Sequence, residues 1–205
     1  MSALPLVAAA LGYPDDALIA GRAAIAREAR GLPDGPGREP LRAFLDWWAR
    51  EPADALRRRY VETFDLSRRT SLDMTYATHG DRRQRGLALL ALRRRYADAG
   101  LELEGPELPD HLPVMLEFAA LEPDAGAALL AEFRPVIELL RLALERAESP
   151  WAGLLGALCA SLPALDEEGL ADVRRLAHDG PPGESVGLEP FAPPEIMPAC
   201  GEGAR

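Results

Sequence analysis

The chain of 205 residues contains no lysine and no asparagine, and it has only two cysteines and three histidines. Schiff-base catalysis and a Walker-type phosphate loop are excluded, because both depend on a lysine amine. Cys159 and Cys200 lie far apart in unlike contexts, so nothing indicates a disulfide framework and a reducing compartment fits best. No histidine stands at metal-ligand spacing from another histidine or a cysteine, so we expect no metal site.

Long apolar runs are also missing. The N-terminal stretch lacks the basic region of a secretory signal and is interrupted by Pro5, and no later segment has the length of a membrane span. No serine sits in a nucleophile elbow, and no glycine-rich cofactor fingerprint follows a strand pattern. We therefore expect a soluble, cytoplasmic protein that is not itself membrane-inserted, with no catalytic residue and no cofactor.

The net charge of −10 is unevenly distributed along the chain. Residues 57–95 hold eleven arginines and four acids, a net of +7, whereas residues 96–205 hold twenty-one acids and six arginines, a net of −15. The acidic remainder would repel phosphates near the basic region, so we expect no nucleic-acid partner. The arginine runs at 57–59 and 93–95 are interpreted as solvated helix faces, with a docking surface for acidic patches of a large client as the alternative.

The abundance of Leu, Ala, Arg and Glu with few β-branched residues predicts an all-α protein. Apolar residues recur at helical spacing through residues 1–178, which we interpret as one helical domain. Asp15 suits a helix N-terminus, Pro52 restarts a helix, and Pro135 should kink or divide one. The segment Gly31 to Pro40 is predicted to be a loop.

Two segments of unusual composition interrupt or follow the helical pattern. The Glu-, Gly- and Pro-rich connector at about 100–110 is a candidate central hinge loop. Residues 179–205 form an acidic tail rich in Pro and Gly, and we expect this tail to be disordered because it has few apolar residues to bury.

Three motifs carry a resemblance to a known family: Tyr60-Val-Glu-Thr-Phe64-Asp65, Thr75-Tyr-Ala-Thr-His79-Gly-Asp81 and Glu107-Leu-Pro-Asp110-His111. In these motifs the chain closely resembles the molybdenum-cofactor assembly chaperones of respiratory nitrate reductase, the delta subunits. The resemblance implies a single-domain helical bundle of the molybdoenzyme-chaperone type. It further implies a chaperone that binds the N-terminal peptide of the catalytic (alpha) subunit and holds the apoenzyme for molybdenum cofactor insertion before membrane anchoring.

The resemblance also implies where a client peptide would bind. Helix-in-groove recognition would place an amphipathic client segment against an apolar slot. The family's acidic-Pro-Asp-His loop maps onto the third motif, and the apolar helix that follows would supply the slot. The residues proposed for peptide binding are Tyr60, Phe64, Glu107, Pro109, Asp110, His111, Leu112, Met115, Leu116, Glu117 and Phe118.

Plainer interpretations of the same residues stay open. Asp110 and His111 can be simply a helix cap and its neighbour, and an aromatic pair at i and i+4, such as Tyr60 and Phe64, is more often part of a core. The client can also be another molybdoenzyme, of the dimethyl sulfoxide or trimethylamine oxide reductase type, although the second motif argues against this. A further alternative is an enzyme that acts on a nucleotide or cofactor precursor through Asp110 and His111 as an acid/base pair.

Overall fold

The computed structural model describes residues 3–32, 34–35, 37–80 and 82–180, and within these ranges the chain forms eleven α-helices and no strand. The prediction of an all-α protein is confirmed. None of the described helices combines the length and the apolar character needed to cross a membrane. Residues 181–205, which make up most of the predicted tail, and Asp81 of the second motif lie outside the described residues. The α-helices are α1 (Leu4–Leu11), α2 (Asp16–Ala29), α3 (Arg38–Arg50), α4 (Ala53–Tyr60), α5 (Tyr76–His79), α6 (Arg83–Asp98), α7 (Leu112–Leu121), α8 (Pro123–Glu132), α9 (Arg134–Arg146), α10 (Trp151–Ser161) and α11 (Glu167–Asp179).

Several helix boundaries follow from the sequence signals. The Asp15 carboxylate accepts a hydrogen bond from the Leu18 amide at 2.7 Å and caps α2, and α4 begins directly after Pro52. Pro135 lies in the first turn of α9, where its missing N–H is no loss, so the chain divides between α8 and α9. The predicted loop at 31–40 was wrong at its end, because α3 already begins at Arg38 and takes Pro40 into its first turn.

The helices pack around a buried tryptophan. Trp151 of α10 is fully buried, and its indole N–H donates to the carbonyl oxygen of Ala10 in α1 at 3.1 Å. The ring centroids of Phe44, Trp47, Tyr60 and Phe64 lie between 5.2 and 6.0 Å from that of Trp151. Aromatic pairs at these distances add to the free energy of apolar burial. The cluster therefore ties α1, α3, α4 and α10 into one core.

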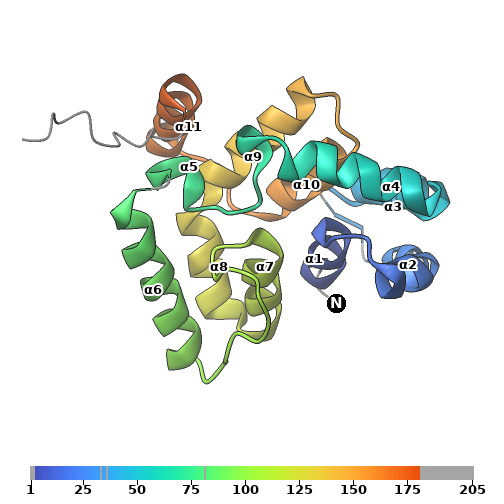
Figure 1. Ribbon diagram of the computed structural model, residues 1–205, viewed down its shortest axis with the longest axis horizontal. Coiled ribbons are helices and arrows are strands. Elements are labelled where there is room, and N and C mark those ends of the chain that lie inside the picture. The colour runs from blue at the N-terminus through green and yellow to red at the C-terminus, as the bar shows by residue number, and fades with distance from the viewer. Residues whose placement is uncertain (1–2, 33, 36, 81, 181–205) are drawn as a thin grey trace, which may run out of the picture.

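The remaining helices extend this core and leave one helix at the edge. Helix α7 packs against both α1 and α8, α10 packs against α3 and α9, and α11 packs against α9. In Figure 1, α6 lies at the edge of the molecule, and the connector that follows it runs back to α7. Residues of the connector, α7 and α1 therefore come together on one side of the molecule.

Candidate functional site

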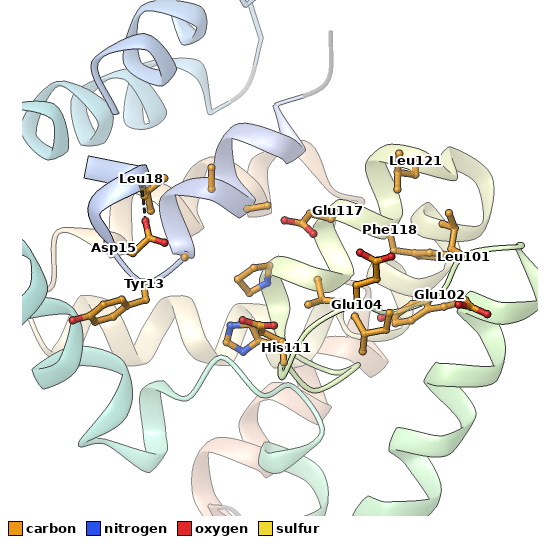
Figure 2. Close-up of a pocket in the computed structure, with 18 of the residues that line it drawn as sticks. Tyr13, Asp15, Leu18, Leu101, Glu102, Glu104, His111, Glu117, Phe118 and Leu121 are labelled. Atoms are coloured by element: carbon orange, nitrogen blue, oxygen red, sulfur yellow. Dashed lines mark hydrogen bonds between the residues drawn. The ribbon is translucent and has the colours of Figure 1, made fainter. Parts of the chain in front are cut away.

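An open groove of about 880 Å³ lies between α1, the start of α2, the connector at 101–107 and α7. Figure 2 shows the elements from which its residues come: Tyr13 and Asp15 from the turn after α1, Glu102 and Glu104 from the connector, and Glu117 from α7. Segments that are far apart in the sequence therefore build a single site.

The groove combines apolar walls with an acidic rim. Apolar side chains come from every wall, among them Leu18, Leu101, Val114 and Leu121. Leu121 keeps 65% of its surface exposed, so an apolar side chain is available at the surface of the groove. Among the described residues the lining contains no arginine, and six carboxylates share it with the apolar residues: Asp15, Asp65, Glu102, Glu104, Glu107 and Glu117. This surface suits an amphipathic segment with basic side chains.

Helix α7 serves the core and the groove with two different stripes. Its residues Leu112, Met115 and Leu116 have no exposed surface and pack into the core. The groove is lined by a second stripe at i, i+3, i+4 and i+7 spacing, which consists of Val114, Glu117, Phe118 and Leu121. The helix is apolar around most of its circumference because both stripes carry large apolar side chains.

The aromatic pair of the first motif lies at the base of the groove. The Tyr60 hydroxyl donates to the carbonyl oxygen of Leu11, at the end of α1, at 2.9 Å, and the Tyr60 ring lines the groove. Burial raises the pKa of the Tyr60 phenol, with a smaller contribution from Asp65, so this hydroxyl stays a donor. Phe64 lies one layer behind, at 4.8 Å between ring centroids, and does not line the groove. The chain passes through this pair in a π-helical turn, Val61–Asp65, a geometry frequent at functional sites.

Asp110 holds a buried corner behind the groove. Its carboxylate has no exposed surface, and one oxygen, Oδ2, accepts hydrogen bonds from the Thr75 amide at 3.0 Å and the Thr75 hydroxyl at 2.5 Å. The guanidinium of Arg85 lies 3.5 Å from the same oxygen. The interpretation of Asp110 as a helix cap was wrong: His111 occupies the N-cap position of α7, and the Asp110 carboxylate joins two segments 35 positions apart instead.

The same corner fixes His111 at the groove surface. His111 and Asp73 form an isolated antiparallel bridge, and His111 Nδ1 lies 3.2 Å from Asp73 Oδ1. The hydrogen bond with His111 and the hydrogen bond from Arg85 hold the pKa of the Asp73 carboxyl below its usual range, against the opposing effect of burial. Asp73 is therefore a carboxylate that orients the imidazole, whose ring lines the groove.

The end of the connector is anchored by a buried tyrosine. The Tyr96 hydroxyl donates to the Pro109 carbonyl oxygen at 2.6 Å, which ties the end of α6 to the third motif. Burial raises the pKa of Tyr96, and the nearby Asp110 carboxylate adds to this effect. The connector thus leaves α6 and reaches α7 between fixed points, and its residues 101–104 and Glu107 line the groove between them.

The structure brings together some of the predicted binding residues and separates others from the groove. Tyr60, Glu107, His111, Glu117 and Phe118 line it. The residues buried behind it are Phe64, Pro109, Asp110, Leu112, Met115 and Leu116. Sequence reasoning missed the α1 wall, formed by Ala8, Ala9 and Gly12, and the two connector acids Glu102 and Glu104. The acidic composition of the connector was a usable signal for the acids, whereas nothing in the small residues of α1 distinguishes a groove wall from a core face.

Other chemistry finds little support in these residues. Among the described residues, no group of three His, Cys, Asp or Glu side chains could hold a metal ion. Burial raises the pKa of the Cys159 thiol to about 12, which leaves it a poor nucleophile. Asp110 does not reach the groove, so it presents no carboxylate there to work with His111 as an acid/base pair.

The all-α architecture has a counterpart among solved proteins. The fold is similar to the crystal structure of an Archaeoglobus fulgidus protein assigned to redox enzyme maturation, with a TM-score of 0.59 and 25% identity, over 76% of this chain and 89% of that one. Residues 32–157 match the family model of the nitrate reductase delta subunit, and the chain belongs to this family.

Two relatives illustrate the range of the family. The chain is 34% identical over 177 residues to the nitrate reductase molybdenum cofactor assembly chaperone NarJ of Escherichia coli strain K12, covering 84% of this chain and 75% of the relative. It is 40% identical over 135 residues to the nitrate reductase-like protein NarX of Mycobacterium tuberculosis, covering 65% of this chain. The match spans only 21% of the length of NarX.

Proposed function

We propose that this protein is a cytoplasmic chaperone for nitrate reductase assembly, and that its groove binds the N-terminal peptide of the catalytic subunit. By holding that peptide, the chaperone keeps the apoenzyme ready for insertion of the molybdenum cofactor before membrane anchoring. The observation that carries the proposal is the apolar groove, which the described residues line with six carboxylates and no arginine. The chain's membership of the delta subunit family supports the choice of client.

Binding in this groove follows the helix-in-groove mode. A helical client segment would lay its apolar side chains against Val114, Phe118 and Leu121, while basic side chains on its flanks meet Glu104 and Glu117 across the opening. Burial of apolar area supplies affinity at about 25 cal/mol per Å², less the cost of ordering the peptide. The carboxylates contribute orientation and speed of association more than affinity.

In this function the protein binds and releases its client without a covalent step. The chaperone's residues hold a segment and release it, and the connector at 100–110 is the element we propose to move on release. The end of the connector at Pro109 is held by Tyr96 and by the buried Asp110 carboxylate. Before that end, Gly100 and Gly105 have positive φ angles of 78° and 103°. These glycines allow a backbone path that other residues adopt only with strain.

A calorimetric titration with a synthetic peptide of the catalytic subunit's N-terminus tests the proposal. The substitution Leu121→Asp places a charge on the apolar wall, and we expect at least about a tenfold loss of affinity, equivalent to about 1.4 kcal/mol. Leu170→Asp in α11 is the matched control, because Leu170 is 42% exposed and does not line the groove. Equal affinities for the two variants would contradict the proposed site.

The identity of the client requires a second comparison. N-terminal peptides of dimethyl sulfoxide and trimethylamine oxide reductases serve as competing probes in the same titration. We expect the nitrate reductase peptide to bind at least about tenfold more tightly than either. A preference for one of the other peptides would reassign the client while leaving the groove in place.

A further inference from the structure

Helix α6 is weakly buried for its length. Of its 16 residues only Leu92 and Tyr96 are buried. Two large apolar residues point outward instead, since Leu87 is 67% exposed and Leu90 is 46% exposed. Leu87, Leu90 and Ala91 share one face at i, i+3 and i+4 spacing. In Figure 1 the helix stands at the edge of the molecule, and the exposure of the two leucines shows that this face is open to a partner.

The charge of α6 is opposite to that of the groove. The helix carries five arginines and one acid, Asp98, in a chain whose net charge is −10. Arg85 and Arg95 have carboxylate partners in Asp73 and Glu132. Arg93 and Arg94 are exposed, and within the part of the chain that the structure describes neither has an ion-pair partner. Unpaired arginines beside exposed leucines are a surface that an acidic, apolar segment would complement.

A cleft runs along the neighbouring side of the same helix. It has a volume of about 480 Å³, with Ala91 and Leu92 of α6 on one side and Phe133 and Val136 on the other. Arg95 reaches across to Glu132 at 2.9 Å, but their side chains are 35% and 59% exposed. An ion pair this exposed stabilises little, so an incoming carboxylate can compete for Arg95 at small cost.

We propose that α6 and this cleft form a second docking surface, which binds an acidic segment on the body of the catalytic subunit outside its N-terminal peptide. The choice of client rests on the proposed function, whereas the surface itself rests on the exposed leucines, the unpaired arginines and the cleft. Apolar side chains of the segment pack on Leu87 and Leu90 and reach the cleft at Ala91, which belongs to both the outward face and the cleft lining. Its carboxylates meet Arg93 and Arg94 beside Leu90, and Arg95 at the cleft. The chaperone then holds one client at two places with surfaces of opposite charge, which raises the apparent affinity through effective concentration.

A protein segment fits this surface better than an anionic membrane does. A helix that lies in a membrane interface buries a broad, continuous apolar face. The outward face of α6 offers two leucines interspersed with small residues and arginines, and the adjoining cleft has a volume of about 480 Å³, enough for individual side chains. The six groove carboxylates would also be repelled by an anionic bilayer.

The test measures binding of the apo catalytic subunit from which the N-terminal segment has been deleted. We expect it to bind the native chaperone, and to lose about tenfold or more in affinity with Arg93→Glu/Arg94→Glu and with Leu87→Ala/Leu90→Ala. The control Arg27→Glu/Arg58→Glu changes the charge equally at two exposed arginines outside the groove and the cleft, and it should bind like the native protein. Binding to the native chaperone should weaken with added salt, because exposed charges are screened.

The outcomes separate this proposal from the groove proposal. Titration with the N-terminal peptide should give the same affinity for the native protein and for Arg93→Glu/Arg94→Glu. If the N-terminal peptide does not bind at all and the truncated subunit still binds through α6, the second docking surface is supported and the groove proposal is refuted. No binding of the truncated subunit, or equal binding by all variants, overturns the second surface. The native protein can also be sedimented with phosphatidylglycerol vesicles. If it binds the vesicles and Arg93→Glu/Arg94→Glu abolishes that binding, the second docking surface is overturned in favour of a membrane contact.

Discussion

Replacing Asp110 with asparagine tests whether the buried corner holds the third motif in place. The substitution keeps the size of the side chain but removes the charge that Arg85 faces at 3.5 Å. The asparagine oxygen can still accept the Thr75 bonds, yet its amide N–H groups would then occupy the position of Oδ1, which has no hydrogen-bond partner among the described residues. Unsatisfied buried donors cost about 1–3 kcal/mol, and lost charge assistance costs about 1 kcal/mol more. We expect Asp110→Asn to lower the free energy of unfolding by about 2–4 kcal/mol.

Urea unfolding followed by circular dichroism and by tryptophan fluorescence measures this loss, and coincident transitions justify a two-state treatment. Thr75→Val removes one hydrogen bond to the carboxylate and should cost about 1.5–3 kcal/mol. The double variant should lose less than the sum, because both changes act on the same contact. Glu62→Gln, at an exposed position, should change stability by at most about 0.5 kcal/mol. A loss for Asp110→Asn as small as that of Glu62→Gln would refute the structural role of the corner.

Three further predictions concern stability and reactivity. The folded state holds the pKa of the Asp73 carboxyl below its unfolded value of about 3.9. The ionised Asp73 therefore stabilises the fold above that pH, and this stabilisation is lost as the pH falls through the folded pKa. Urea unfolding curves of the native protein and of Asp73→Asn should converge in acid. Gly126→Ala should destabilise the protein by about 1–3 kcal/mol, because the new Cβ would lie 2.2 Å from the Ala119 Cα. Gly86→Ala in α6 meets open space and should stabilise the protein by about 0.5–1 kcal/mol in the same urea assay. Cys159, whose pKa burial raises to about 12, should resist iodoacetamide in the native protein and react in urea, as followed by mass spectrometry.

Local signals predicted most of the helices, because capping and proline effects act within one turn. The Asp15 cap, the restart at Pro52 and the division at Pro135 all depend on neighbours a few residues away. Asp110 fits the same local pattern for a cap, but its carboxylate bonds to Thr75, which is 35 positions away. Spacing along the chain holds no information about such a partner, so this assignment failed.

The candidate site was only partly predictable for a related reason. Helix α7 is apolar on both stripes, so periodicity selects Leu112, Met115 and Leu116 as readily as the stripe that contains Val114 and Leu121. Only the packing of α7 against α1 and α8 decides that the first stripe is core and that the second faces the groove. Motif resemblance pointed to the loop and the helix that line this groove, and tertiary structure was needed to choose the face.

Hydrogen exchange with and without the catalytic subunit's N-terminal peptide tests the central claim most directly. The account predicts that the peptide slows exchange in residues 101–107 and 114–121, the two segments that contribute most of the groove lining, while 167–179 in α11 exchanges as before. Tight peptide binding that leaves 101–107 and 114–121 unprotected and slows exchange elsewhere would contradict it.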